Sequence, residues 1–191
     1  MASKTSRAEQ WRQELAGWEI PAALVANAPE PPWGFPVGLF HAEPDPVDTF
    51  SRDRALDVLP PNGSVLDVGC GGGAASLALV PRAATVTGVD SGPGMLADFA
   101  ASADARGVAH HEVAGTWPDI AGEVDAADVV VCHHVFYNVA SLPPFVTALT
   151  SHARRRVVVE LTAEHPMVLS RCRPTAHRVA SKSRAVCLSS R

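Results

Sequence analysis

Two hydrophobic periods alternate along the central part of the chain. Short apolar runs rich in valine are separated by stretches in which apolar residues recur every three or four positions. Runs of the first kind are typical of strands buried in a parallel sheet, and the second spacing is typical of amphipathic helices. We expect strands at residues 64–68, 84–90, 108–114, 128–132 and 157–161.

Helices are predicted before and between these strands. Asp45-Pro46 has the sequence of a helix N-cap followed by proline at the first helical position. The expected helices cover residues 47–59 and 74–79, and further helices open after Ser91 and after Ser141. This alternation predicts an α/β fold with a doubly wound, mainly parallel sheet and helices on both faces.

The turn after the first predicted strand is rich in glycine and has the spacing Asp67-x-Gly69-x-Gly71-x-Gly73. Glycine permits backbone angles that other residues avoid and leaves a surface without side chains. A strand, a glycine turn and a helix N-terminus together favour a nucleotide-type site. The spacing also satisfies the looser dinucleotide fingerprint, with Ala74 in the third small position.

The same spacing resembles the first motif of the class I S-adenosylmethionine-dependent methyltransferases. Asp67 favours this resemblance over a dinucleotide site, because a carboxylate would repel a pyrophosphate but attract the ammonium and sulfonium of S-adenosylmethionine. The resemblance implies that Asp67 and the turn hold the aminocarboxypropyl part of that cofactor. The turn residues expected to contact it are Gly69, Cys70, Gly71 and Gly73.

A second acid, Asp90, ends the second predicted strand, 17 positions after Gly73. A carboxylate only accepts hydrogen bonds, so it suits both hydroxyls of a ribose, and it matches the second methyltransferase motif. A dinucleotide enzyme uses the same acid, so Asp90 alone does not choose between the two cofactors. Ser91 follows it directly, and Met95 either touches the adenosine or lies in the core.

The resemblance implies an acid after the third strand that contacts the adenine amino group. This chain has Thr116 or Trp117 at that place, so the contact is expected to differ. Trp117 offers a flat surface for a base, and packing in the core is its alternative. Asp119 could supply polarity from a distance.

The fourth predicted strand ends at His133-His134, followed by Tyr137 and Asn138. Ligands of doubly wound sheets bind beyond the carboxyl ends of the strands, so this segment should face the transferred methyl group. Adjacent histidines in an extended segment point to opposite faces, and we expect His133 to face the pocket and to contact the cofactor. Both histidines are candidates for a general base, and Tyr137 or Asn138 could line the acceptor side; capping and packing is the alternative for each.

Composition adds few constraints. The chain has 191 residues, 47% of them hydrophobic, and a formal net charge of −4, which gives no reason to expect a nucleic-acid partner. There is no apolar run of membrane-spanning length and no signal-peptide pattern, so we expect a cytoplasmic protein with a small-molecule acceptor. The cysteines show no zinc or redox spacing, so no metal site and reduced thiols are expected; they are Cys70, Cys132, Cys172 and Cys187.

Three regions are expected: a lid at residues 1–45, a cofactor-binding core at 46–165 and an atypical basic tail at 166–191. In the lid, Trp11 and Leu15 fall at helical spacing, and its aromatic residues favour a small apolar acceptor; they are Trp18, Trp33, Phe35 and Phe40. Arg154–Arg156 are read as a solvated lead-in to the fifth strand.

The tail departs from the family pattern. Class I methyltransferases continue after the fifth strand with a helix and two strands, but only 30 residues follow Leu161, and no clear strand pair is visible in them. A shortened C-terminus would leave the fifth strand as an open edge. We therefore expect either that the tail covers this edge or that the protein self-associates through it.

The sequence therefore predicts an S-adenosylmethionine-dependent methyltransferase. Two alternatives stay open: a nucleotide-dependent oxidoreductase on a similar sheet, and a non-catalytic, shortened methyltransferase-like protein.

Overall fold

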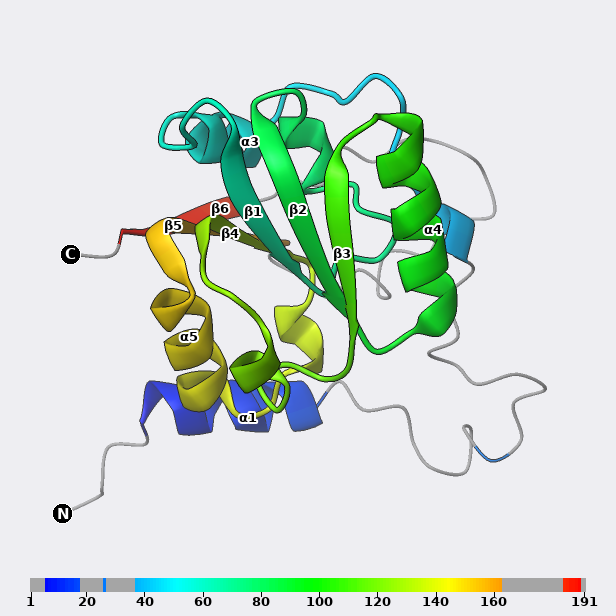
Figure 1. Cartoon of the computed structure of the whole chain (residues 1–191). Helices are drawn as coiled ribbons and strands as arrows, with labels where there is room; N and C mark the ends of the chain where they lie inside the picture. The colour runs from blue at the N-terminus through cyan, green and yellow to red at the C-terminus, as the bar shows by residue number, and fades with distance from the viewer. Residues whose placement is uncertain (1–5, 18–25, 27–36, 163–183, 190–191) are drawn as a thin grey trace, which may run out of the picture.

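The computed structural model describes residues 6–17, 26, 37–162 and 184–189, the last six by their backbone (Figure 1). Six strands form one sheet in the order β3-β2-β1-β4-β5-β6. The first five run parallel, and β6 is antiparallel to β5. Their bounds are β1 Gly63–Val68, β2 Ala83–Asp90, β3 Ala109–Ala114, β4 Ala127–His133, β5 Ala153–Leu161 and β6 Arg184–Ser189. The predicted doubly wound, mainly parallel fold is confirmed.

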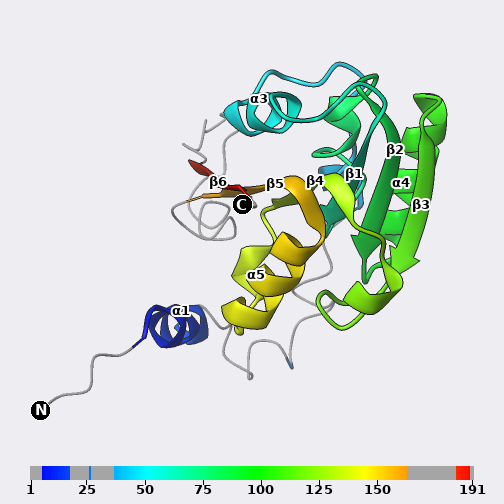
Figure 2. The same ribbon diagram turned by 60° about the vertical axis from the view of Figure 1, so that its left-hand side comes forward.

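Helices cover both faces of the sheet. The α-helices are α1 Arg7–Ala16, α3 Phe50–Leu56, α4 Pro93–Ala105 and α5 Leu142–Ser151. Short 3-10 helices are η1 Val37–Leu39, η2 Leu77–Leu79, η3 Ala121–Glu123 and η4 Phe136–Asn138. Helices α3 and α4 lie on one face, and α5 lies on the other with α1 beside it (Figures 1 and 2). No helix of the described segments is long and apolar enough to cross a membrane.

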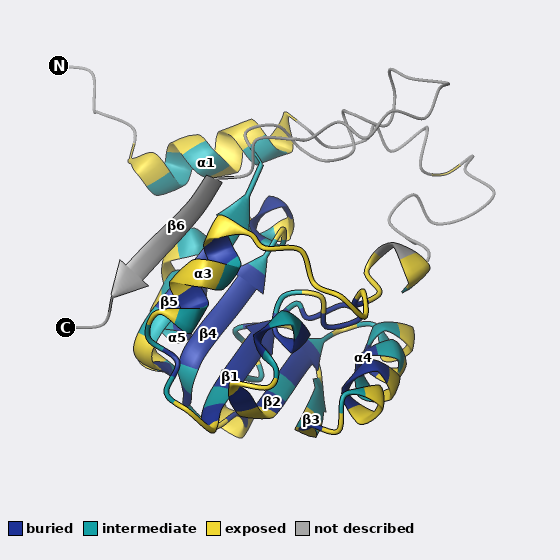
Figure 3. Ribbon diagram, turned by 90° about the horizontal axis from the view of Figure 1, so that it is seen from above, coloured by how far each residue is buried: buried dark blue, intermediate teal, exposed yellow. Residues whose placement is uncertain are grey.

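The hydrophobic core has two parts, one on each face of the sheet, and the central strands between them are buried (Figure 3). Side chains of a strand alternate between faces, so Val65 packs with Phe99 of α4 while its neighbour Leu66 packs with Phe145 of α5. Trp11 of α1 packs against the second part, and its indole nitrogen donates to the carbonyl of Val139 at 2.8 Å. The alternation of side chains along each strand also decides on which face of the sheet a polar residue at the strand end lies.

The predicted helix at residues 47–59 is shorter than expected. Helix α3 spans Phe50–Leu56, and its N-cap is Thr49, whose hydroxyl accepts the backbone N–H of Arg52 at 3.1 Å. Asp45 is therefore not the cap. A side-chain acceptor one turn closer to the apolar residues satisfies the free N–H groups of the first turn instead.

The helix predicted at residues 74–79 is also wrong, because only the single turn of η2 forms there. Residues 69–82 connect β1 to β2, and Pro81 cannot continue a helix. The backbone N–H of Ser76 bonds to the Asp67 side chain at 3.3 Å, which competes with regular helical bonding.

One strand of the tail lies where no clear strand pair was seen in the sequence. Strand β6 pairs with β5 in antiparallel register, Val158 opposite Cys187, so the tail covers the edge of the fifth strand. This is the first of the two outcomes that we expected for that edge. Arg154–Arg156 lie within β5 and are not a lead-in to it, because the pairing with β4 already begins at Ala153.

Candidate active site

The carboxyl ends of four parallel strands lie side by side along one end of the sheet; these strands are β1, β2, β4 and β5. The order of strands reverses at β1, with β2 on one side of it and β4 on the other. Ligands of such sheets bind beyond the strand ends at this switch point. Three features lie at this end of the sheet: the glycine turn (residues 69–73), Asp90 and the two histidines.

Every backbone N–H group of the glycine turn already has an acceptor. Gly69 and Cys70 donate to the carbonyl of Val89 at 2.8 and 3.0 Å, Gly71 to the Asp90 carboxylate at 3.0 Å, Gly72 to the carbonyl of Phe40 at 3.2 Å, and Gly73 to that of Cys70 at 2.8 Å. Loops that cradle a pyrophosphate present free N–H groups to it. This turn has none to present.

Close approach by other segments explains two of the glycines. Gly69 has a φ of +71°, and a Cβ atom there would lie 2.4 Å from the Val135 side chain. A Cβ atom on Gly72 would lie 2.6 Å from the carbonyl oxygen of Phe40. The chain itself therefore uses part of the surface that the glycines leave bare.

Residues 40–42, in the part of the expected lid that the structure describes, lie across the glycine turn. His41 forms bridges with Gly72 and Gly73, and its Nδ1 lies 3.0 Å from both carboxylate oxygens of Asp98 in α4. Phe40 is 37% exposed. Trp18, Trp33 and Phe35 lie outside the described residues, so the enclosing role of the lid stays a prediction.

Asp67 lies beneath the glycine turn. Like Val65 it points to the face that η2 covers, and it is 1% exposed. Its Oδ2 accepts the Ser76 hydroxyl at 2.6 Å, while its buried Oδ1 has no partner among the described residues. Burial outweighs the Ser76 hydrogen bonds and, with the neighbouring Asp90 charge, raises the pKa of Asp67 to about 7.

The expectation that Asp67 presents its carboxylate beside the glycines is therefore wrong. Alternation along β1 turns the side chain into the protein, where it anchors Ser76 and the end of the turn. That a cofactor interacts with Asp67 stays a prediction.

Asp90 lies where the sequence placed it, at the carboxyl end of β2. One oxygen accepts the N–H of Gly71 at 3.0 Å, and the other accepts the N–H of Gly92 at 2.8 Å. The residue is half-buried, and each carboxylate oxygen keeps a lone pair beyond the one used. Asp90 thus ties the glycine turn to the start of α4 and still has acceptor capacity for a ligand.

The residues expected around an adenosine differ in exposure. Ser91 and Thr116 are exposed and Met95 is half-buried. Trp117 is 6% exposed and lies in the core, its ring edge-on to His152 with centroids 4.9 Å apart. This placement matches the packing alternative for Trp117.

Cys70 and Cys132 are buried thiols without a disulfide. Burial, together with the nearby Asp67 carboxylate, raises the pKa of both. The Cys70 sulfur points to the carbonyl of Gly71 at 3.4 Å. A neutral, buried thiol of this kind adds packing and no charge to the site.

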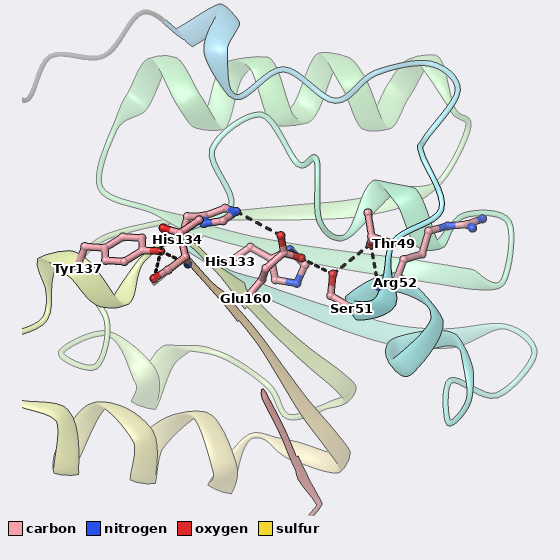
Figure 4. A network of polar contacts seen from close by, with 8 residues as sticks. Thr49, Ser51, Arg52, His133, His134, Tyr137 and Glu160 are labelled. Carbon is pink, nitrogen blue, oxygen red and sulfur yellow. Dashed lines mark hydrogen bonds and ion pairs between the residues drawn. The ribbon is translucent and has the colours of Figure 1, made fainter. Parts of the chain in front are cut away.

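His133 and His134 converge on one carboxylate, that of Glu160 at the end of β5. His133 Nδ1 lies 3.8 Å from Glu160 Oε2, and His134 Nε2 lies 3.4 Å from Oε1 (Figure 4). The expectation that the two rings point to opposite faces is wrong, because His134 leaves the strand with a φ of +59°. Its ring turns back toward Glu160.

Tyr137 and Asn138, which follow these histidines, differ in burial. Tyr137 is buried, and its ring lies nearly parallel to that of His134 with centroids 6.4 Å apart. Asn138 is exposed. Within the described segments, no cluster of three His, Cys, Asp or Glu side chains could hold a metal ion.

Comparison with known proteins points to one family. A family of methyltransferase domains matches residues 65–156. A curated protein from Rhizobium leguminosarum bv. trifolii (strain WSM2304), a ubiquinone biosynthesis O-methyltransferase, is 32% identical over 123 residues, which are 62% of this chain and 47% of that protein.

Residues 65–156 form a methyltransferase domain, and the doubly wound sheet around them has the fold of the class I S-adenosylmethionine-dependent methyltransferases.

Two solved structures share the fold of this chain. The precorrin 8w decarboxylase of Methanobacterium thermoautotrophicum has a TM-score of 0.52 at 18% identity, with 71% of this chain and 76% of that chain covered. TehB from Haemophilus influenzae has a TM-score of 0.51 at 20% identity, with 61% and 41% covered. The chain spans about half the length of the curated relative it matches.

The candidate site fits S-adenosylmethionine better than a dinucleotide. The glycine turn has no free N–H group for a phosphate, which disfavours a dinucleotide. Asp90 keeps acceptor capacity for ribose hydroxyls, which both cofactors have. These features suit an adenosine compound without phosphate.

Sequence reasoning missed two residues that contact the candidate site, Glu160 and Ser51. Glu160 was read only as part of the fifth strand, although an acid at the carboxyl end of a parallel strand was the signal used for Asp67 and Asp90. Ser51, on α3, lies 109 positions away in sequence and donates its hydroxyl to Glu160. No local pattern indicates such a contact.

Proposed function

We propose that this protein transfers the methyl group of S-adenosylmethionine to a small-molecule acceptor. The observation that carries the proposal is the glycine turn of residues 69–73, whose N–H groups all have acceptors, beside the half-buried carboxylate of Asp90. When bound, S-adenosylmethionine supplies a methyl group attached to a sulfonium. The sulfur is the leaving group and keeps the electron pair of the broken bond. The chain supplies binding and alignment, and alignment alone is worth roughly 7–11 kcal/mol of the barrier.

The residues have separate roles in this proposal. Asp90 accepts the ribose hydroxyls, and Ser91 and Met95 lie at the start of α4, where the adenosine side would be. Asp67 and Ser76 hold the glycine turn from below. The described residues 40–42 lie over the turn, which supports a lid role for the N-terminal region.

The acceptor atom is proposed to be oxygen. The curated relative is an O-methyltransferase by name, and it is similar over 62% of this chain. A neutral hydroxyl is a weak nucleophile, so its methylation needs a base. His133 and His134 at the end of β4 are the two candidates within the described residues.

Isothermal titration calorimetry with S-adenosylhomocysteine tests cofactor binding. We expect micromolar binding to the wild type and at least a tenfold loss in Asp90→Ala, since removal of a charged hydrogen-bond acceptor costs roughly 1.5–3 kcal/mol. Asp125→Ala, an exposed acid before β4, is the matched control and should bind as the wild type does. Absence of binding at millimolar ligand, or equal binding by Asp90→Ala, contradicts the proposal.

The same titration separates the alternatives. Binding of NAD in place of S-adenosylhomocysteine would support the oxidoreductase. S-adenosylhomocysteine binding without transfer of a labelled methyl group to any of a panel of phenols and catechols would favour the non-catalytic protein.

A further inference from the structure

Glu160 is the centre of a polar network that joins three segments far apart in sequence. Its carboxylate receives the Ser51 hydroxyl from α3 and faces His133 and His134 from the end of β4 (Figure 4). Thr49 is the N-cap of α3, and its Oγ1 lies 3.1 Å from the Ser51 hydroxyl oxygen. Glu160 Oε2 is therefore held by Ser51, while Oε1 is directed at His134.

The register of the sheet brings Glu160 to this place. Glu160 lies opposite His133 in the parallel pairing of β4 with β5. Both side chains emerge on the α3 face, because their neighbours Cys132 and Val159 point to the α5 face. The backbone N–H of His134 donates to the carbonyl of Glu160 at 2.9 Å, which holds the turn that folds the His134 ring back.

The charge of each group follows from its surroundings. Hydrogen bonding to His134 and then to Ser51 outweighs desolvation and lowers the pKa of Glu160 to about 2, so this side chain is ionised at neutral pH. Burial outweighs the attraction of Glu160 and lowers the pKa of His133 to about 4. His133 is therefore uncharged at neutral pH and a weak proton acceptor.

His134 differs from His133 in access. Its side chain is 40% exposed, against 18% for His133, and its Nε2 is the atom nearest Glu160. A carboxylate at one ring nitrogen favours the proton on that nitrogen and leaves the lone pair on the other. For His134 the nitrogen with the lone pair is Nδ1.

We propose that Glu160 is a positioning residue that holds the His134 imidazole by Nε2, so that Nδ1 acts as the general base for an acceptor with a neutral hydroxyl group. This inference rests on the proposed methyltransferase function. It assigns the base to His134 in place of His133, and it restricts the acceptor to alcohols and phenols that are not ionised at the working pH.

The proton and electron balance is complete without a further reactant. His134 Nδ1 would take the proton of the acceptor hydroxyl as the oxygen lone pair forms the new bond to the methyl carbon; the bond from that carbon to sulfur would break, with its electron pair going to the sulfur. The imidazolium so formed is stabilised by the Glu160 carboxylate and then releases its proton to water. The products are a methyl ether, S-adenosylhomocysteine and one proton.

Few titratable side chains surround Glu160 and His134 within the described residues. Within the described side chains, the titratable groups around Glu160 are His133 and His134 from β4; α3 contributes the neutral Ser51 hydroxyl. Tyr137 of η4 lies against His134, and its hydroxyl bonds to Thr162.

Kinetics of three variants with catechol as acceptor test the coupling. We expect His134→Gln to lower kcat about 100-fold or more and Glu160→Gln about 10- to 100-fold, as for carboxylates that orient a functional histidine. KM for S-adenosylmethionine should stay unchanged in both. The double variant should be no slower than His134→Gln, because Glu160 acts through His134; additive losses would overturn the proposal.

A matched control and an acceptor series sharpen this test. Glu112→Gln removes the acid of another histidine–glutamate pair, His110–Glu112 on β3, and should leave kcat unchanged. With 4-nitrocatechol, which is largely ionised at neutral pH, the loss in Glu160→Gln should shrink to less than about threefold. An equal loss with both acceptors would assign Glu160 a structural role and reject the proposal.

Nuclear magnetic resonance provides a readout that does not need turnover. In the full chain labelled with ¹⁵N, the Nε2 proton of His134 should be protected from exchange by Glu160, and His134→Gln assigns its signal. Loss of that signal in Glu160→Gln, with S-adenosylhomocysteine binding unchanged, supports the positioning role. A His134 ring protonated at Nδ1 overturns it, whereas lack of S-adenosylhomocysteine binding by the wild type overturns the proposed function alone.

Discussion

Asp67→Asn removes a buried carboxylate whose ionisation the folded state opposes. The pKa of an exposed aspartate is 3.8, and burial raises that of Asp67 to about 7. Between these pH values the unfolded chain has released a proton that the folded protein still binds, so the free energy of unfolding falls as pH rises from about 4 to 7. At about 1.36 kcal/mol per pH unit, the loss is about 4 kcal/mol.

Asparagine has nearly the shape of aspartate and accepts the Ser76 hydrogen bonds through its carbonyl oxygen, but it does not ionise. The unfolding free energy of Asp67→Asn minus that of the wild type should therefore increase by about 2–3 kcal/mol from pH 5 to pH 8. Urea denaturation at each pH, followed by tryptophan fluorescence, measures this change.

Asp128→Asn is the matched control. Asp128 Oδ2 also accepts both the hydroxyl and the backbone N–H of a serine, Ser64, at 3.1 and 3.0 Å. There the desolvation is outweighed by Ser64 and by Arg155, and the pKa of Asp128 is lowered. This variant should lose stability relative to the wild type above pH 5. A stability difference for Asp67→Asn that is constant with pH would refute the reasoning.

Two further predictions concern the glycine turn and the edge of the sheet. Gly72→Ala should lower the free energy of unfolding by about 1–3 kcal/mol in urea titrations, because its Cβ atom would lie 2.3 Å from Asp98 Oδ2 and 2.6 Å from the Phe40 carbonyl oxygen; Gly122→Ala, with no atom within 4 Å, is the control, and equal effects would contradict the contact. Deletion of residues 184–191 removes β6 and leaves the β5 backbone unpaired, so size-exclusion chromatography should show larger species than for the full chain; an unchanged elution volume would show that β6 does not protect this edge.

Several features of the site could be predicted because they depend on near neighbours. The valine-rich runs placed the five parallel strands within a few residues of their observed bounds. Gly69, Gly71 and Gly73 were identified at a strand end, and all three have positive φ. Asp90 was placed beside the same turn. Each of these conclusions needs only the order of residues along a few turns of chain.

Other features depend on contacts between distant segments, which local periodicity does not contain. The sequence showed an acid at position 67, but only the packing of Ser76 and η2 against β1 made that acid buried and hard to ionise. The sequence showed two histidines, but the left-handed turn at His134 and the register of β4 with β5 brought both to Glu160. Chain order therefore determined the sheet and put the glycine turn and Asp90 at its switch point. Tertiary packing decided the charge and orientation of the polar groups, because both depend on desolvation and on partners up to 109 positions away.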